Sequence, residues 1–474
     1  MQLQFFGAAR TVTGSMFLLT LGGCNILIEC GLRQGSPKEE QENFAEFPFD
    51  VAKLHAVVLT HAHLDHSGRI PLLVKRGYNG PIHTHSATGE LCEILFQDAA
   101  HINEKETIWE NKKRARKGLS LLSPLYSQDE AKQAVSQFQT YGYGESVTIA
   151  PGVAITFHDA GHILGSAIVE LLLTEGGMER RIVFSGDLGH SGAPILRDPA
   201  VVTNADLVVM ESTYGDRLHR SWEQTWLEMQ DIFRSPSIHK GNILIPSFAI
   251  GRSQEVMYGL AKHYQDWNIG QWSIFLDSPL AIKATEIYRN HVNLYDRETL
   301  NLTNNNTLEN SSEKLFGLAN VHYSLTAEQS MALNQINNGA IIIAGSGMCD
   351  GGRIKHHLKH NVWRRDCNIL IVGYQAQGTL GRRLVDGAKH IRLWGETIQV
   401  NAKIHTIGGF SAHADQRGLL HWLGQFKSRP HVVLVHGENR AIDTLREEIA
   451  GNFTFKVLTP EKNQCLELTD FELY

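Results

Sequence analysis

Alternating hydrophobic and polar residues predict β structure at the start of the chain. Short stretches of this kind, separated by glycine-containing turns, predict strands at 2–6, 15–21 and 25–29. A continuous apolar run predicts a buried strand at 56–60, and helically spaced apolar residues predict helices at 87–111 and 127–139. Strand patterns then return at 153–158, 167–173, 181–184 and 207–210.

The pattern changes near residue 212, where strands and helices begin to alternate. The predicted strands are 242–245, 273–276, 340–344 and 368–372, and the predicted helices are 221–233, 252–267, 279–290 and 326–337. Regular alternation of this kind is typical of an α/β domain with a parallel sheet. Near residue 393 the pattern changes back, with β segments at 399–407 and 431–435 and helices at 415–425 and 438–450. The Asn-rich stretch 301–312 is expected to be a loop.

Composition indicates a folded globular protein. The chain has 474 residues, of which 42% are hydrophobic and 20% charged, so two or three domains are expected. The N-terminus does not resemble a signal peptide, no apolar run approaches 18 residues, and the six cysteines form no CxxC pair. We therefore expect a cytoplasmic protein with no membrane contact. The net charge of −6 gives no support to nucleic-acid binding, whereas the 24 histidines direct attention to metal chemistry.

A dense group of potential metal ligands follows the buried strand. His61, His63, Asp65 and His66 lie within six residues, and imidazole and carboxylate groups are the ligands of catalytic zinc. Side chains two residues apart in an extended segment point the same way, so His61 and His63 can share one metal. Asp65 and His66 can then bind a second metal. The alternative is a histidine-rich surface loop.

Three further single residues follow predicted strands. His162 comes after 153–158, Asp187 after 181–184 and His436 after 431–435. Each alone is weak evidence, because a lone residue after a strand is more often structural. All three nevertheless lie at the strand ends where α/β sheets collect their site residues.

Together these motifs resemble the metallo-β-lactamase superfamily. Glu211-Ser212-Thr213-Tyr214-Gly215, Phe410-Ser411-Ala412-His413-Ala414-Asp415 and Leu434-Val435-His436-Gly437-Glu438 are similar to motifs A, B and C of its β-CASP branch. Segments 246–252, 277–281 and 345–348 are also similar to characteristic β-CASP segments. The resemblance covers nearly the whole chain, and the type it favours is the compact bacterial or archaeal ribonuclease related to the mRNA 3′-end-processing endonuclease.

The resemblance implies an α/β fold, an αββα metallo-β-lactamase sandwich with an inserted α/β β-CASP domain. The expected boundaries are 1–211 and 393–474 for the sandwich and 212–392 for the insert. It further implies two zinc ions per chain, one on His61, His63 and His162 and the other on Asp65, His66 and His436, with Asp187 between them. Position 29 is usually Asp in this family, whereas here it is Glu29, which is expected to orient a ligand or a site loop.

The resemblance also implies a catalytic acid and an RNA substrate. His413, held protonated by Glu211, is expected to protonate the leaving oxygen. Asp187 is expected to be a catalytic residue as well as a metal ligand. Without the resemblance, a structural histidine in a turn is an equal alternative for His413. His436 at motif C favours the RNA-cleaving members of the branch.

Basic residues give local support for an RNA partner. A glycine loop at 345–352 precedes a cation-rich helix and can offer backbone N–H groups to phosphate. The expected RNA or phosphate contacts are Arg252, Ser346, Gly347, Arg353, Lys355 and His357. A second basic run at 112–117 is more simply explained as a solvated helix face.

The sequence thus favours a zinc-dependent ribonuclease, expected to be an endonuclease acting in RNA processing or decay. The alternatives are a 5′-3′ exoribonuclease, a small-molecule metallo-hydrolase using the same site, a non-catalytic RNA-binding scaffold and a redox diiron protein. The wide insert argues against a small substrate, and the complete ligand set argues against a scaffold. The histidine at position 63 argues against diiron. A homodimer is compatible with the sequence, which does not decide it.

Overall fold

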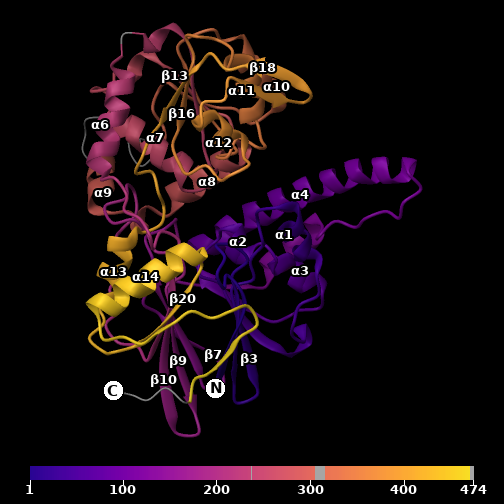
Figure 1. Cartoon of the computed structure of the whole chain (residues 1–474), viewed down its shortest axis with the longest axis vertical. Coiled ribbons are helices and arrows are strands. Elements are labelled where there is room, and N and C mark those ends of the chain that lie inside the picture. Colours follow the sequence, from indigo (N-terminus) through magenta and orange to yellow (C-terminus); the bar gives the residue numbers. More distant parts are fainter. Residues whose placement is uncertain (236, 305–314, 470–474) are drawn as a thin grey trace. The chain divides into compact units, whose positions relative to one another are not determined.

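The chain forms two compact units in the computed structural model (Figure 1). The structure describes residues 1–235, 237–304 and 315–469. Unit 1 contains residues 1–191, 198–218 and 413–474, and unit 2 contains residues 192–197 and 219–412. The second unit is therefore an insertion in the first, as the two changes of pattern along the sequence predict.

Unit 1 contains two seven-stranded sheets. The first has the order β22 (Cys465–Glu467), β1 (Gln2–Gly7), β2 (Met16–Leu21), β3 (Cys24–Ile28), β4 (Leu54–Val58), β5 (Ile82–His85) and β6 (Phe138–Tyr141). The second has the order β21 (Val457–Leu458), β20 (His431–Val435), β11 (Leu207–Glu211), β10 (Met178–Phe184), β9 (Ala167–Glu175), β8 (Val153–Asp159) and β7 (Ser146–Ala150).

The hydrophobic core of unit 1 joins the two sheets face to face. Phe17 and Val58 of the first sheet share one buried cluster with Val169 and Val209 of the second. The helices of unit 1 are α1 (Pro37–Gln41), α2 (Leu64–Ser67), α3 (Ile70–Lys75), α4 (Ser86–Arg116), α5 (Gln128–Ser136), α13 (Gln416–Leu423) and α14 (Asn439–Asn452). Trp422 of α13 belongs to a second cluster on the other face of β11 and β20, so helices cover that sheet from outside. This arrangement is the expected αββα sandwich.

Unit 2 is an α/β domain around a six-stranded parallel sheet. The strand order is β14 (Val321–Tyr323), β13 (Ser273–Leu276), β15 (Ala340–Ala344), β12 (Ile243–Pro246), β16 (Asn368–Ile371) and β19 (Lys403–Thr406). A separate hairpin pairs β17 (His390–Leu393) with β18 (Glu396–Gln399). The helices are α6 (Trp222–Phe233), α7 (Arg252–Lys262), α8 (Pro279–Asn290), α9 (Arg297–Asn304), α10 (Ala327–Ala332), α11 (Ile354–Asn361) and α12 (Leu380–Val385). The predicted fold class is confirmed for both units.

The sequence pattern predicts the bounds of most helices and strands to within a few residues of those observed. A capping box begins α5, because the Ser127 side chain accepts from the backbone N–H of Glu130 and the Glu130 side chain bonds back to the backbone of Ser127. The helix predicted at 127–139 nevertheless ends at Ser136, and the chain enters β6, which pairs with β5 across the sequence. Of the expected loop at 301–312, residues 301–304 continue α9, and the rest lies outside the described residues.

The units divide the chain at other residues than the sequence pattern suggested. β19 pairs in parallel with β16, and the stretch up to Ala412 belongs to unit 2, whereas the boundary expected from the sequence pattern is 392. At the other boundary, residues 212–218 follow β11 and stay with unit 1. The pairing of β19 with β16 joins residues far apart in sequence, and a pattern along the chain does not report such pairing.

Candidate metal centre

The ends of several strands of unit 1 bring the predicted ligands together. His61 and His63 follow β4, and Asp65 and His66 lie in the short helix α2 directly after them. His162 follows β8, Asp187 follows β10 and His436 follows β20. These seven side chains form two groups, in each of which the potential ligand atoms lie within 4.8 Å of one another.

The first group contains three histidines and one carboxylate. His63 Nδ1 lies 3.1 Å from His61 Nε2 and 3.1 Å from His162 Nε2. The Oδ2 atom of Asp187 lies 3.4 Å from His61 Nε2 and 3.6 Å from His162 Nε2. Four ligand atoms therefore surround one point.

The second group has the same character. His66 Nε2 lies 3.1 Å from His436 Nε2, which in turn lies 3.4 Å from Asp65 Oδ2. The other oxygen of Asp187, Oδ1, lies 3.3 Å from His66 Nε2. Asp187 thus turns one carboxylate oxygen to each group.

These distances fit a pair of tetrahedral metal ions. Ligand nitrogens about 2.05 Å from a tetrahedral zinc ion are about 3.3 Å apart, which is close to the separations observed here. Asp187 is almost fully buried, and its Oδ1 atom accepts no hydrogen bond in the described part of the chain. A buried carboxylate oxygen without a donor is costly unless a cation binds it. The donor set therefore fits the metal that the resemblance implies.

Hydrogen bonds from behind orient three of the imidazole rings. Thr60 Oγ1 lies 2.9 Å from His61 Nδ1, Glu29 Oε2 lies 2.8 Å from His66 Nδ1, and Thr213 Oγ1 lies 3.0 Å from His436 Nδ1. Each contact occupies Nδ1 and leaves Nε2 facing the metal position, which is the usual arrangement around metal-binding histidines. Neither threonine is among the site residues predicted from sequence, although Thr60 directly precedes the histidine cluster and Thr213 lies in motif A.

Burial keeps most of these imidazoles in the form that binds metal. It lowers the pKa of His61 to about 3 and the pKa of His63 to about 4, and it lowers the pKa of His162 well below its usual value. These rings are neutral at pH 7, as ligation requires. Burial also opposes the charged form of His66, but the carboxylates of Asp187 and Asp65 outweigh it and raise its pKa.

Glu29 connects two parts of the site. Its Oε2 atom contacts His66, and its Oε1 atom accepts a hydrogen bond of 2.8 Å from the backbone N–H of Thr60. Glu29 has a φ of +62°, and His436 has a φ of +49°. Non-glycine residues adopt this region at a cost, and such residues concentrate at functional sites. The glutamate at position 29 therefore orients one ligand and the strand end that carries another.

Glu29→Gln should weaken zinc binding by about 10- to 100-fold, the usual effect of removing a group that orients a ligand. Thr60 and His66 contact different oxygens of Glu29, and Gln has an oxygen at only one of these two positions, so one of the two contacts is lost. Competition with a chromophoric chelator measures the affinity, and Glu46→Gln, at an exposed position, is the matched control. Equal zinc affinity in both variants would show that Glu29 does not position His66.

A histidine and a glutamate lie beside the two ligand groups. His413 Nδ1 lies 3.0 Å from Glu211 Oε2, and the other oxygen of Glu211 accepts a hydrogen bond of 2.5 Å from the backbone of Leu188. His413 is fixed by a β-bridge to Gly189 and is partly exposed, whereas Glu211 is buried. Burial lowers the pKa of His413, but the carboxylates of Glu211 and Asp187 raise it to about 9. His413 therefore carries a proton at pH 7.

Two residues of unit 2 that the sequence predicts to contact RNA, Arg353 and His357, are bound to other groups inside the unit. Arg353 donates to Asp277 Oδ1 at 2.7 Å and to the backbone oxygens of Ser324 and Leu325. His357 is fully buried, with Nε2 2.5 Å from Asp277 Oδ2. Both side chains therefore hold the inside of the unit together and are not placed to receive a phosphate.

Arg252 is engaged in a similar way, whereas the remaining three residues lie in or near the glycine loop. Arg252 forms an ion pair of 2.9 Å with the buried Glu255. The N–H of Ile354, at the start of α11, bonds to Gly345 within the loop. Ser346, Gly347 and Lys355 are therefore left as the candidates for RNA contact in this unit.

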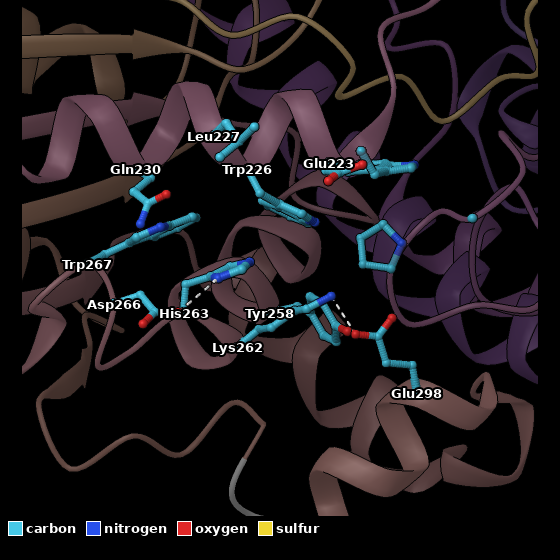
Figure 2. Close-up of a pocket in the computed structure, with 13 residues that line it drawn as sticks. Glu223, Trp226, Leu227, Gln230, Tyr258, Lys262, His263, Asp266, Trp267 and Glu298 are labelled. Carbon is cyan, nitrogen blue, oxygen red and sulfur yellow. Dashed lines mark ion pairs between the residues drawn. The ribbon is translucent and has the colours of Figure 1, made fainter.

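Unit 2 also contains a cavity of about 380 Å³, shown in Figure 2. Its walls carry Trp226, Trp267 and Tyr258, together with the carboxylates of Glu223, Asp266 and Glu298. Lys262 also lines it and is paired with Glu298. Three carboxylates against one lysine do not favour a phosphate chain, so this cavity is no candidate for the RNA path.

Known families match the chain in three consecutive segments. A metallo-β-lactamase superfamily model matches residues 9–236, a Beta-Casp domain model matches 253–384, and a model described as a Zn-dependent metallo-hydrolase RNA specificity domain matches 397–460. No helix in the described part of the chain has the length and apolar character needed to cross a membrane.

Two curated relatives and one solved structure are similar to this chain. Ribonuclease TTHA0252 of Thermus thermophilus is 38% identical over 450 residues, which cover 95% of this chain and 96% of that protein. Transcription termination factor FttA of Methanocaldococcus jannaschii is 31% identical, over 92% of this chain and 67% of its own length. A crystal structure of a protein of unknown function from Enterococcus faecalis V583 has a TM-score of 0.53 at 12% identity. It covers 98% of this chain and 99% of its own, and shows a similar fold.

The chain belongs to the β-CASP family of the metallo-β-lactamase superfamily, as its motifs suggested. It is a hydrolase of the metallo-hydrolase class, and its clustered histidines and carboxylates support metal binding.

Proposed function

We propose that the protein is a zinc-dependent ribonuclease that holds two zinc ions per chain and cuts RNA internally. The observation that carries this proposal is the shared Asp187, whose two oxygens face two separate groups of imidazole and carboxylate ligands. The relative named ribonuclease, which aligns over nearly its whole length, supports RNA as the substrate. The match to an RNA specificity domain over the segment containing His413 and His436 supports it further.

The residues have separate tasks in this mechanism. His61, His63 and His162 would hold one ion, Asp65, His66 and His436 the other, and Asp187 would bind both. Bound zinc supplies Lewis acidity and an activated water for phosphodiester hydrolysis. Glu211 holds the proton of His413 on Nδ1 and fixes the ring, so that Nε2–H can protonate the leaving oxygen of the RNA.

Cleavage of RNA labelled at its 5′ end tests the proposal. With zinc, internal cutting gives labelled fragments of many lengths from the first time point, whereas 5′-3′ exonucleolytic action releases labelled mononucleotide first. Excess chelator should leave the RNA intact, because it removes the metal. RNA that stays intact with zinc would contradict the ribonuclease proposal, and RNA cut equally with chelator would contradict its metal dependence.

A further inference from the structure

The long helix α4 continues well beyond the body of unit 1. Its first half contributes buried residues such as Leu91, Leu95 and Phe96 to the core, whereas none of its residues from His101 onward is buried. Figure 1 shows its C-terminal end reaching past α1 and α3 of the same unit, with the chain running back beside it. We call residues 101–125, the outer half of the helix and the returning segment, the arm.

The arm is held in one conformation by its own polar side chains. Asn111 exchanges two hydrogen bonds with the backbone of Leu122, at 2.8 and 2.9 Å, and Arg114 Nε donates to Ser120 O at 2.6 Å. Closer to the body, Leu125 N donates to Asn103 Oδ1 at 2.7 Å. Because these bonds fix the returning segment on the helix, a partner would bind the arm without first having to order it.

Charge on the outer arm opposes the charge of the whole chain. Residues 111–125 contain five basic residues and no acidic residue, whereas the chain as a whole has a net charge of −6. The five are Lys112, Lys113, Arg114, Arg116 and Lys117. A local excess of exposed positive charge on an otherwise acidic protein indicates a polyanionic partner.

An aromatic side chain lies among these cations. Trp109 is 62% exposed, and Lys113 Nζ lies 3.0 Å from the centre of its ring. On the helix, Lys105, Lys112 and Lys113 fall at i−4, i+3 and i+4 from Trp109 and share its face with one acidic residue, Glu106 at i−3. Lys113 Nζ also lies 3.6 Å from Glu110 Oε2. Exposed aromatic rings among cations are the features that bind single-stranded nucleic acid, since bases stack on the ring and phosphates meet the cations.

The same interleaving disfavours a lipid surface as the partner. A helix that lies in a membrane interface separates its apolar face from its cationic face. Here Trp109 shares its face with lysines and Glu106, and the exposed Ile108 adjoins Lys112 one turn away. Other exposed apolar side chains of the arm, Leu119, Leu121 and Leu122, lie on the returning segment and not on the helix, so they do not form an apolar face of the helix.

The start of α4, the helix that continues into the arm, contacts a loop of the metal centre. Thr88, in the first turn of α4, donates a hydrogen bond of 2.6 Å to the backbone oxygen of Gly165, in the loop that carries His162. At 1.5 Å per residue, Lys105 is about 28 Å and Arg116 about 45 Å along the helix from its first residue. A stacked strand advances about 3.4 Å per nucleotide, so about eight nucleotides span the shorter of these distances.

We infer that the arm is a second RNA-binding element, which holds single-stranded RNA by its cations and Trp109 at a distance from the metal centre. This inference rests on the proposed ribonuclease function. The arm would select for RNA length, because only a strand that extends well past the cleavage site can reach the arm.

Binding of a 30-nucleotide and a 6-nucleotide RNA tests this inference. Dissociation constants are measured in the His413→Ala background, so that the RNA stays whole. Replacing Lys112, Lys113 and Arg116 together by glutamine should weaken binding of the longer RNA about tenfold and change that of the shorter RNA less than twofold. The slope of log affinity against log salt should fall by about 2, since single-strand contacts contribute about 0.7 each. Trp109→Ala should weaken binding of the longer RNA by about fivefold or more.

A charge-matched variant separates the arm from general electrostatics. Lys53, Lys427 and Arg446 are exposed or half-exposed cations elsewhere in unit 1, and replacing them by glutamine removes the same charge. This control should bind both RNAs like the parent protein. Equal dissociation constants for the arm variant and this control would overturn the inference.

Two further outcomes are distinguishable. If the protein without substitutions fails to cut RNA, the proposed function fails, whereas the arm inference is decided by the dissociation constants alone. Sedimentation with phosphatidylserine vesicles is measured in parallel. Vesicle binding that is lost in the arm variant, with RNA affinity unchanged, would overturn the inference in favour of a lipid surface.

Discussion

Asp187→Ala should remove zinc from both positions and abolish RNA cleavage. Its Oδ2 faces His61 and His162, and its Oδ1 faces His66, so this one substitution takes a ligand from each group. Loss of a two-metal centre removes several kcal/mol of transition-state stabilisation, which corresponds to a rate decrease of about a thousandfold or more. Zinc per chain by elemental analysis and cleavage rate on the same samples measure both effects.

Single-group variants are the comparison for Asp187→Ala. His162→Ala should deplete mainly the first position and His436→Ala mainly the second, because each contributes to only one group. Two zinc ions retained in Asp187→Ala, with zinc lost from the other two variants, would contradict the bridging position of Asp187.

His413→Ala should keep both zinc ions and still slow RNA cleavage by about 10²- to 10⁴-fold, the range for loss of a general acid. His413 approaches Asp187 no closer than 3.8 Å and is held by Glu211, so its removal leaves the ligand groups complete. Elemental analysis and single-turnover cleavage separate the two effects. An RNA with a good leaving group at the scissile bond should recover much of the lost rate, because such a leaving group needs no proton.

His421→Ala is the matched control for His413→Ala. His421 lies eight residues further along, in α13, and is exposed. Its removal should change neither zinc content nor rate. Cleavage at the unsubstituted rate in His413→Ala would rule out the acid role, and zinc loss in that variant would make His413 part of the metal centre.

The metal centre could be anticipated from sequence because its ligands follow strands that the hydrophobic pattern already predicts. His61 and His63 are two residues apart at the end of β4, and alternation alone places their side chains on one side. His162, Asp187 and His436 each follow another strand. The family motifs joined these separate signals into one proposed set, and the structure brings that set together in two groups.

The outer contacts of the centre could not be anticipated in the same way. The bond of Thr213 to His436 joins residues 223 positions apart, and the bond of Glu29 to His66 depends on the chain turning at a positive φ. In unit 2, Arg353 and His357 resemble phosphate ligands in sequence, but Asp277 binds both. Local patterns report residue type and spacing, whereas such partners are set by how strands assemble.

For the basic run at 112–117, the sequence predicts less function than the structure suggests. As a run of charge it predicts only a solvated helix face. The structure adds that the helix leaves the core near His101, that Asn111 and Arg114 fix the returning chain, and that Trp109 lies exposed among the cations. Those observations turn an ordinary charged segment into a candidate binding element.

The most direct test of the two-metal account is RNA cleavage measured while zinc is added back to metal-free protein. Bound zinc per chain is determined in the same samples. The account predicts no cleavage without metal and full cleavage only when two zinc ions are bound per chain. Full activity at one zinc ion per chain, or RNA left intact with two bound, would contradict it.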